Sequence, residues 1–106
     1  MKVLTKSKIR SQNLIKYALT ERNVMSVMNH PFIVRLRYAF QTQDKLFFIC
    51  DYCPGGDLSQ YLEIEKQFTE AKAKFYIAEI LLAIEALHDR DIIFRDLKPD
   101  NVVLDE

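Results

Sequence analysis

Along the first third of the chain, the spacing of apolar residues changes from one typical of a β-strand to one typical of an α-helix. Residues 1–4 hold an adjacent valine and leucine, which favour extended structure and predict a strand. A basic, polar stretch follows, and Ser11 is then a plausible N-cap for a helix whose apolar positions recur at helical spacing as far as Met28. Pro31 favours the end of this helix, because the residue before a proline is pushed out of the α region. We therefore expect a strand, a polar break and one helix over about residues 11–28.

The next segment predicts a β-hairpin. Residues 33–40 alternate apolar with polar side chains, as in a half-buried strand, and residues 45–52 form a second, mainly apolar strand. Residues 41–44 are polar and suit the turn between the two strands. Pro54-Gly55-Gly56 then breaks the sheet, and because it holds the only glycines of the chain we expect a hinge there.

Two capped helices are expected after this hinge. Asp57 is well placed to cap a short helix that ends near Glu63, and Thr69 is well placed to cap the next one. Eleven of the thirteen residues over 75–87 are apolar. A helix that is apolar nearly all round is buried on most sides, so we expect partners or further chain to cover it.

The last polar run of the chain, Phe94-Arg95-Asp96-Leu97-Lys98-Pro99-Asp100-Asn101, lies between two short apolar groups. Residues 92–93 and 102–104 favour β structure, so we predict that the run is a tight connection between two short strands. Such a loop lets polar side chains converge on one point while its apolar flanks hold it still. Taken in order, the predicted elements indicate an α+β fold with segregated strands and helices.

Composition limits the classes of partner. The chain has 106 residues, 49% of them hydrophobic and 28% charged, which suits one folded domain or a piece of one. Its fifteen basic and fifteen acidic side chains cancel, so we expect no nucleic-acid partner and no anionic-membrane partner. No apolar run approaches the length of a membrane span and no signal-peptide block begins the chain, so we expect an intracellular, cytoplasmic protein.

The two cysteines form a single C-x-x-C, Cys50-Asp51-Tyr52-Cys53. A zinc or redox site of this type needs a second ligand pair, or a helix that begins after the second cysteine. Neither is present, and both histidines lie far away in sequence. We therefore interpret the pair as two thiols on a half-buried segment and expect no zinc.

The polar run matches the protein-kinase signature H-R-D-L-x-x-x-N at four fixed positions: Arg95, Asp96, Leu97 and Asn101. With the upstream elements in order, essentially the whole chain resembles the middle of a protein kinase domain of the AGC group of serine/threonine kinases. The resemblance implies a partial kinase-like α+β fold. Residues 1–52 would be part of the N-lobe sheet with its helix, 53–57 the hinge, and 58–106 the first helices and the catalytic loop of the C-lobe.

Other landmarks follow in the order and at spacings similar to those of the family. They are the strand with the ATP-binding lysine at 1–4, the helix segment with its partner glutamate at 20–24, the link at 30–34, the strand and hinge that end in Gly55-Gly56-Asp57-Leu58, and the start of a long helix at 74–79. Phe94 stands where the AGC group commonly has tyrosine, and it keeps the ring while losing the hydroxyl. Lys98 followed by Pro99 resembles the serine/threonine class and not tyrosine kinases.

The resemblance implies three roles in the polar run. Asp96 would orient the substrate hydroxyl, Lys98 would offset charge near the γ-phosphate, and Asn101 would ligate Mg²⁺ through its amide oxygen. Arg95 would pair with a phosphate on the activation loop. Considered singly, Asp96 and Asn101 are also common turn residues, and the full run argues against that interpretation.

Further roles are implied upstream. Lys2 would hold the α- and β-phosphates of ATP, with Glu21 keeping it in place, although singly each could be a solvated surface charge. The main-chain groups of Asp51 and Cys53 would bind adenine, and Cys50 would occupy the gatekeeper position behind it, where simple core packing is equally compatible. Asp57 would bind the ribose and face a basic residue of the peptide substrate; the alternative is a helix cap.

Other parts of a kinase site do not occur in these residues. The sequence has no G-x-G-x-x-G, no Asp-Phe-Gly and no Ala-Pro-Glu. We therefore interpret the chain as a fragment of a serine/threonine kinase that uses ATP and Mg²⁺ on protein substrates, with a preference for upstream basic residues, and expect the fragment alone to be inactive. Two alternatives stay open: a non-catalytic, truncated or pseudokinase-like binding module, and an unrelated small α+β binding domain.

Overall fold

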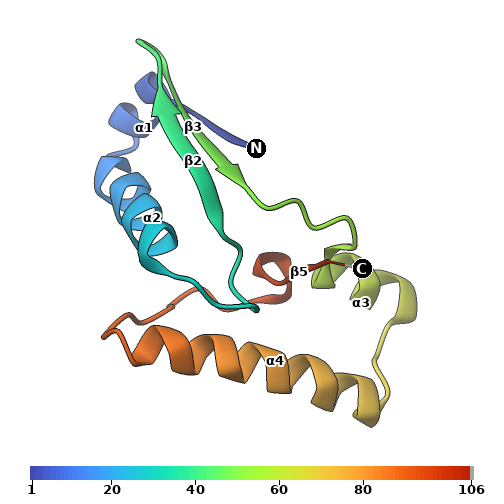
Figure 1. Ribbon diagram of the computed structural model, residues 1–106. Coiled ribbons are helices and arrows are strands. Elements are labelled where there is room, and N and C mark those ends of the chain that lie inside the picture. The colour runs from blue at the N-terminus through green and yellow to red at the C-terminus, as the bar shows by residue number, and fades with distance from the viewer. Residues whose placement is uncertain (106) are drawn as a thin grey trace. The chain divides into compact units, whose positions relative to one another are not determined.

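The computed structural model describes residues 1–105. These residues separate into two compact units, Met1–Asp51 and a second unit that begins at Tyr52. Each unit has its own small sheet and its own helices (Figure 1). The α+β class predicted from the sequence is confirmed.

The first unit is built on a three-stranded antiparallel sheet of order β1-β3-β2. The strands are β1 (Lys2–Thr5), β2 (Leu36–Gln41) and β3 (Lys45–Cys50). β2 and β3 form the predicted hairpin, in which the rings of Phe40 and Phe47 stack with centroids 4.8 Å apart. Phe48 lies in the central strand and is buried. The run of apolar residues in β3 is explained by this central position.

Two helices follow β1, α1 (Lys6–Ser11) and α2 (Ile15–Val27). Figure 1 shows α2 lying along β2. Helix α1 contributes Ile9 to the core of this unit, and α2 contributes Ala18. Met28, just after α2, is also buried.

The prediction of one helix capped by Ser11 is wrong. Ser11 is the last residue of α1, and its hydroxyl donates to the carbonyl of Lys8. Asn13 then takes a left-handed conformation with φ of 54°, and the amide of Leu14 donates back to the carbonyl of Ile9 at 2.8 Å. This is the usual closing turn of a helix, and asparagine tolerates it because its polar side chain can bond locally. The basic stretch before it is helical because Ile9 anchors it in the core.

The second unit contains β4 (Gly56–Asp57), α3 (Leu58–Glu65), α4 (Glu70–His88), the 3₁₀ turn η1 (Pro99–Asn101) and β5 (Val103–Leu104). Both predicted caps are confirmed. Asp57 Oδ1 accepts from the amide of Gln60 at 3.1 Å, and Thr69 Oγ1 accepts from the amide of Lys72 at 3.3 Å. Each cap satisfies an amide that the first helical turn leaves without a partner.

The predicted strand at 92–93 is absent. Asp91 is left-handed with φ of 58°, and the amide of Ile92 donates to the carbonyl of Leu87 at 3.0 Å, so these residues complete the end of α4. β5 pairs with β4 instead. The polar loop is therefore flanked by a helix terminus on one side and by a short strand on the other.

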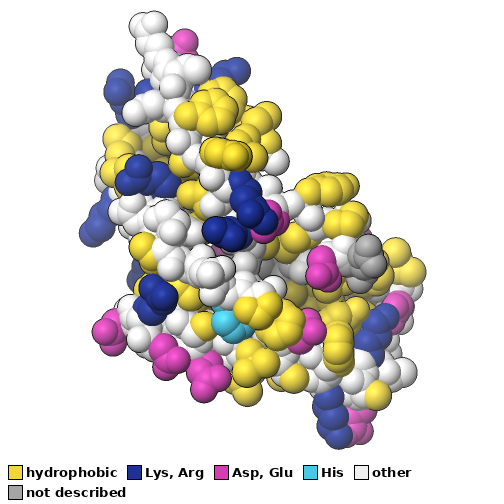
Figure 2. Space-filling model, viewed as in Figure 1, with side chains coloured by type: hydrophobic (Ala, Val, Ile, Leu, Met, Phe, Trp, Pro, Cys, Tyr) yellow, Lys and Arg dark blue, Asp and Glu magenta, His cyan; other side chains and the backbone are white. Residues whose placement is uncertain are grey.

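Much of α4 is exposed within the described part of the chain. Phe75, Ile77 and Leu81 are each at least 60% exposed, and hydrophobic side chains lie at the surface over this helix in Figure 2. Residues 1–105 therefore leave these apolar side chains uncovered, as expected for a helix that partners or further chain would cover. No helix among these residues has the length and apolar character needed to cross a membrane.

Candidate active site

The first predicted pair of site residues, Lys2 and Glu21, forms an ion pair. Lys2 Nζ donates to Glu21 Oε1 at 2.7 Å and to Oε2 at 2.8 Å. Glu21 lies three positions after the buried Ala18 on α2, so the helix presents both to the side that faces the sheet. The two side chains are 50% and 38% exposed. The ammonium is thus held by both carboxylate oxygens while half of its side chain stays accessible.

Asp51, one of the predicted adenine-binding residues, is tied by two hydrogen bonds to the segment in which β2 begins. Its amide donates to the carbonyl of Arg35 at 3.0 Å, and its Oδ1 accepts from Arg37 Nε at 2.5 Å. The hydrogen bond and charge of Asp51 raise the pKa of the Arg37 guanidinium. Any main-chain hydrogen bond from Asp51 to a ligand would therefore use its carbonyl. Our sequence interpretation did not single out Arg37.

The two cysteines lie in different units. Cys50 ends β3 and is partly buried, and this burial raises the pKa of its thiol, so it stays protonated at neutral pH. The carbonyl of Cys53, in the second unit, accepts from the amide of Gly56. No cluster of three or more His, Cys, Asp or Glu side chains suited to a metal occurs in the described residues.

Asp57 is engaged as a helix cap. The hydroxyl of Ser59 and the amide of Gln60 both donate to its Oδ1, and together they lower the pKa of Asp57. The alternative that we gave for Asp57, a cap, is therefore confirmed.

The polar loop brings three predicted site residues together. Asn101 Nδ2 donates to the carbonyl of Asp96 at 2.9 Å and to Asp96 Oδ2 at 3.1 Å. Lys98 Nζ lies 3.4 Å from the same Oδ2. The turn η1, which begins with Pro99, carries Asn101 back toward Asp96. Asp96 and Lys98 are 70% and 48% exposed, so the cluster is accessible from solvent.

One atom of this loop, the amide oxygen of Asn101, is suited to binding a hard cation. The amide nitrogen of Asn101 is used in bonds to Asp96, and this fixes which side of the amide carries the oxygen. An amide oxygen is a suitable ligand for Mg²⁺, which takes few protein ligands together with phosphate oxygens. Asn101 would thus supply one oxygen ligand of such an ion.

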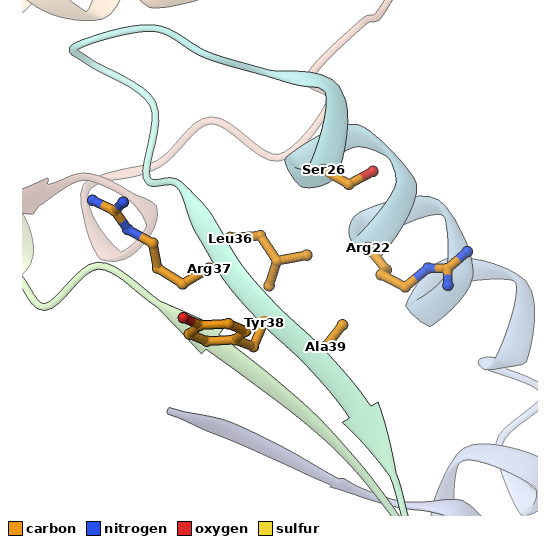
Figure 3. Close-up of a pocket in the computed structure, with 6 residues that line it drawn as sticks. All are labelled: Arg22, Ser26, Leu36, Arg37, Tyr38 and Ala39. Carbon is orange, nitrogen blue, oxygen red and sulfur yellow. The ribbon is translucent and has the colours of Figure 1, made fainter.

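A pocket lies elsewhere in the first unit, between α2 and β2. Figure 3 shows its lining: Arg22, Ser26, Leu36, Arg37, Tyr38 and Ala39. None of the residues that we predicted for catalysis or for nucleotide binding lines it. It does border Arg37, the residue that holds Asp51.

Comparison with known proteins gives consistent matches over the whole chain. Residues 1–106 match the family described as "Protein kinase domain". The chain is 51% identical over 104 residues to a RAC family serine/threonine-protein kinase homolog of Dictyostelium discoideum, covering 98% of this chain and 23% of that protein. It is 49% identical over 106 residues to ribosomal protein S6 kinase alpha-2 of Homo sapiens, covering 100% and 14%. It is 46% identical over 107 residues to serine/threonine-protein kinase sgk-1 of Caenorhabditis elegans, covering 100% and 23%. The chain therefore spans less than a quarter of each of these relatives.

Proposed function

This chain belongs to the protein kinase domain family, in the AGC group, and we propose that it supplies part of the site at which a serine/threonine kinase transfers the γ-phosphate of ATP to protein hydroxyls. The observation that carries the proposal is the ion pair between Lys2 and Glu21. Phosphoryl transfer needs positioned charge more than covalent chemistry, and in this family a lysine–glutamate pair must be formed for activity. An ammonium that is held at both carboxylate oxygens and still accessible suits contact with phosphate oxygens.

The loop residues complete the proposed roles. Asp96 would accept a hydrogen bond from the substrate hydroxyl and orient it, and Lys98 would offset negative charge on the transferred group. Asn101 would hold Mg²⁺, which when bound neutralises phosphate charge. The Asn101 amide also restrains Asp96, since it donates to both the carbonyl and the carboxylate of that residue.

The hinge residues are proposed to bind the nucleoside. The carbonyl of Asp51 and the main chain of Cys53 would meet adenine, and the Asp57 carboxylate would meet ribose or a basic residue of the peptide. A preference for substrates with upstream Arg or Lys follows from that last role. A peptide array with no dependence on upstream basic residues would contradict it.

The 106 residues alone are proposed to be inactive. Their sequence contains neither a G-x-G-x-x-G phosphate loop nor an Asp-Phe-Gly metal ligand. Purified chain that phosphorylates a basic peptide at an ordinary kinase rate of about 1–100 s⁻¹ would refute this.

The function is best tested in a graft, in which these residues replace the matching 104-residue segment of the Dictyostelium homolog. We expect the graft to phosphorylate a serine peptide with ATP and Mg²⁺. Asp96→Asn should remove activity and leave folding intact, which circular dichroism checks. A folded graft without ATP-dependent phosphorylation would overturn the proposal and favour a binding module.

A further inference from the structure

Strand β2 carries an irregularity at Arg37. Its pairing with β3 steps from Leu36 opposite Cys50 to Tyr38 opposite Ile49, so Arg37 is the extra residue of a β-bulge. Figure 3 shows the effect: Leu36 and Ala39 extend from β2 toward α2, whereas Arg37 and Tyr38 both extend to the opposite side. Regular alternation would place neighbours on opposite faces. The bulge therefore re-aims the Arg37 side chain.

The re-aimed side chain ends on Asp51, one residue beyond β3. Arg37 Nε donates to Asp51 Oδ1 at 2.5 Å, and the Arg35 carbonyl, on the other flank of the bulge, accepts from the Asp51 amide at 3.0 Å. The short segment from Arg35 to Arg37, in which β2 begins, thus holds the amide and the carboxylate of the same residue. With the amide and the side chain tied, the Cα and the carbonyl carbon of Asp51 are held in place, and ψ is the one backbone torsion left to direct the carbonyl oxygen.

We propose that Arg37 is a positioning residue for nucleotide binding, which acts through the bulge by holding in place the main chain that carries the Asp51 carbonyl. The inference rests on the proposed function, in which that carbonyl accepts a hydrogen bond from adenine. Arg37 itself touches neither nucleotide nor protein substrate. Bulges are enriched beside active sites, where they re-aim a side chain, and this one lies beside the end of β3 and Asp51.

The alternative is an exposed ion pair with no role. Arg37 and Asp51 are 50% and 39% exposed, and pairs of this kind contribute little to stability. The two possibilities differ in what a variant changes. A functionless pair alters neither the Asp51 amide nor the affinity for ATP, whereas a positioning residue alters both.

Arg35→Ala is the matched control for Arg37→Ala in the graft. Both changes remove one exposed positive charge from the short segment in which β2 begins, and both leave the main-chain bond between Arg35 and Asp51 in place. In the described residues the Arg35 side chain takes part in no ion pair, so its loss should have no consequence at the hinge.

Two measurements test the proposal. Arg37→Ala should raise the KM for ATP about two- to fivefold with kcat within about twofold, the range expected when one exposed charge pair is lost. It should also speed hydrogen exchange at the Asp51 amide, and Arg35→Ala should do neither. The swap Arg37→Asp with Asp51→Arg should restore both values toward those of the unsubstituted graft.

The outcomes separate the two proposals. If Arg37→Ala matches Arg35→Ala in exchange, or if exchange quickens while KM is unchanged, the positioning role is wrong. If the unsubstituted graft is folded but transfers no phosphate, the proposed kinase function fails. ATP affinity measured by titration calorimetry on that same graft still decides the role of Arg37, since unchanged affinity in Arg37→Ala overturns it.

Discussion

Lys2 Nζ lies 2.7 Å from Oε1 and 2.8 Å from Oε2 of Glu21, so one ammonium bridges both oxygens of a carboxylate nineteen residues away. The bond joins the edge strand β1 to the middle of α2. The ion pair of Glu70 and Lys74, by contrast, is local: the two residues lie one helical turn apart and are 84% and 75% exposed. The Lys2–Glu21 ion pair therefore connects two elements of the fold, β1 and α2.

Breaking this link should lower catalysis without unfolding the protein. In the graft, Glu21→Gln keeps the size of the side chain but removes the charge that holds Lys2, and we expect kcat/KM to fall on the order of 10- to 100-fold. Steady-state kinetics with a serine peptide measure this. Glu70→Gln breaks an exposed pair of the same type and should leave the rate unchanged. An equal fall in kcat/KM for Glu21→Gln and Glu70→Gln would show that the Lys2–Glu21 ion pair has no particular role in catalysis.

Asn101 should matter through its amide oxygen as well as through its bonds to Asp96. Asn101→Ala removes the proposed Mg²⁺ ligand and the two hydrogen bonds that restrain Asp96. We expect lower activity and a higher Mg²⁺ concentration at half-maximal rate, measured by titrating Mg²⁺ at fixed ATP. Asp100→Asn, at the neighbouring exposed position of η1, is the control. An Asn101→Ala variant with an unchanged Mg²⁺ requirement would remove Asn101 from the metal site.

Local signals predicted some features of this fold well and partner-dependent features poorly. The caps at Asp57 and Thr69 are confirmed because capping depends on a side chain and an amide three residues away. The hairpin is confirmed because its alternation and turn lie within one short segment. A strand at 92–93 was wrong because β structure requires a partner strand, and those residues close α4 instead.

The ends of α1 and α4 were not predicted from the sequence, and the reason is the same for both. Asn13 and Asp91 both take left-handed conformations and end α1 and α4. Glycine is the usual signal for such a turn, and neither site has one. The link between Arg37 and Asp51 could not be inferred either, because a bulge shifts the alternation by one residue and no period in the sequence marks it.

Asp57 should make stability depend on acidity. Its pKa in the folded chain is lowered by the Ser59 hydroxyl and the Gln60 amide. Because the pKa is lowered, the ionised Asp57 carboxylate stabilises the folded state. Its contribution to the free energy of unfolding is complete above the unfolded pKa of about 3.9 and is lost as the pH falls through the lower folded value. Denaturant unfolding of the graft, compared with Asp57→Asn from pH 6 to 3, should show a difference that shrinks below about pH 4. Ser59→Ala should weaken this pH dependence. A difference that is constant with pH would contradict it.

Even a methyl side chain at position 55 should destabilise the protein, because Gly55 lies very close to Leu104. Its amide donates to the carbonyl of Leu104 at 2.9 Å, and a Cβ at this position would lie 2.7 Å from that carbonyl oxygen and 2.8 Å from the Leu104 Cβ. The oxygen belongs to the backbone of β5, so relief requires the β4–β5 pair to move apart. We expect Gly55→Ala to destabilise the graft by about 1–3 kcal/mol, measured by denaturant unfolding. Ala71→Ser, at an exposed position of α4, should stay within about 0.5 kcal/mol. Gly55→Ala as stable as Ala71→Ser would mean that β4 and β5 do not approach as closely as described.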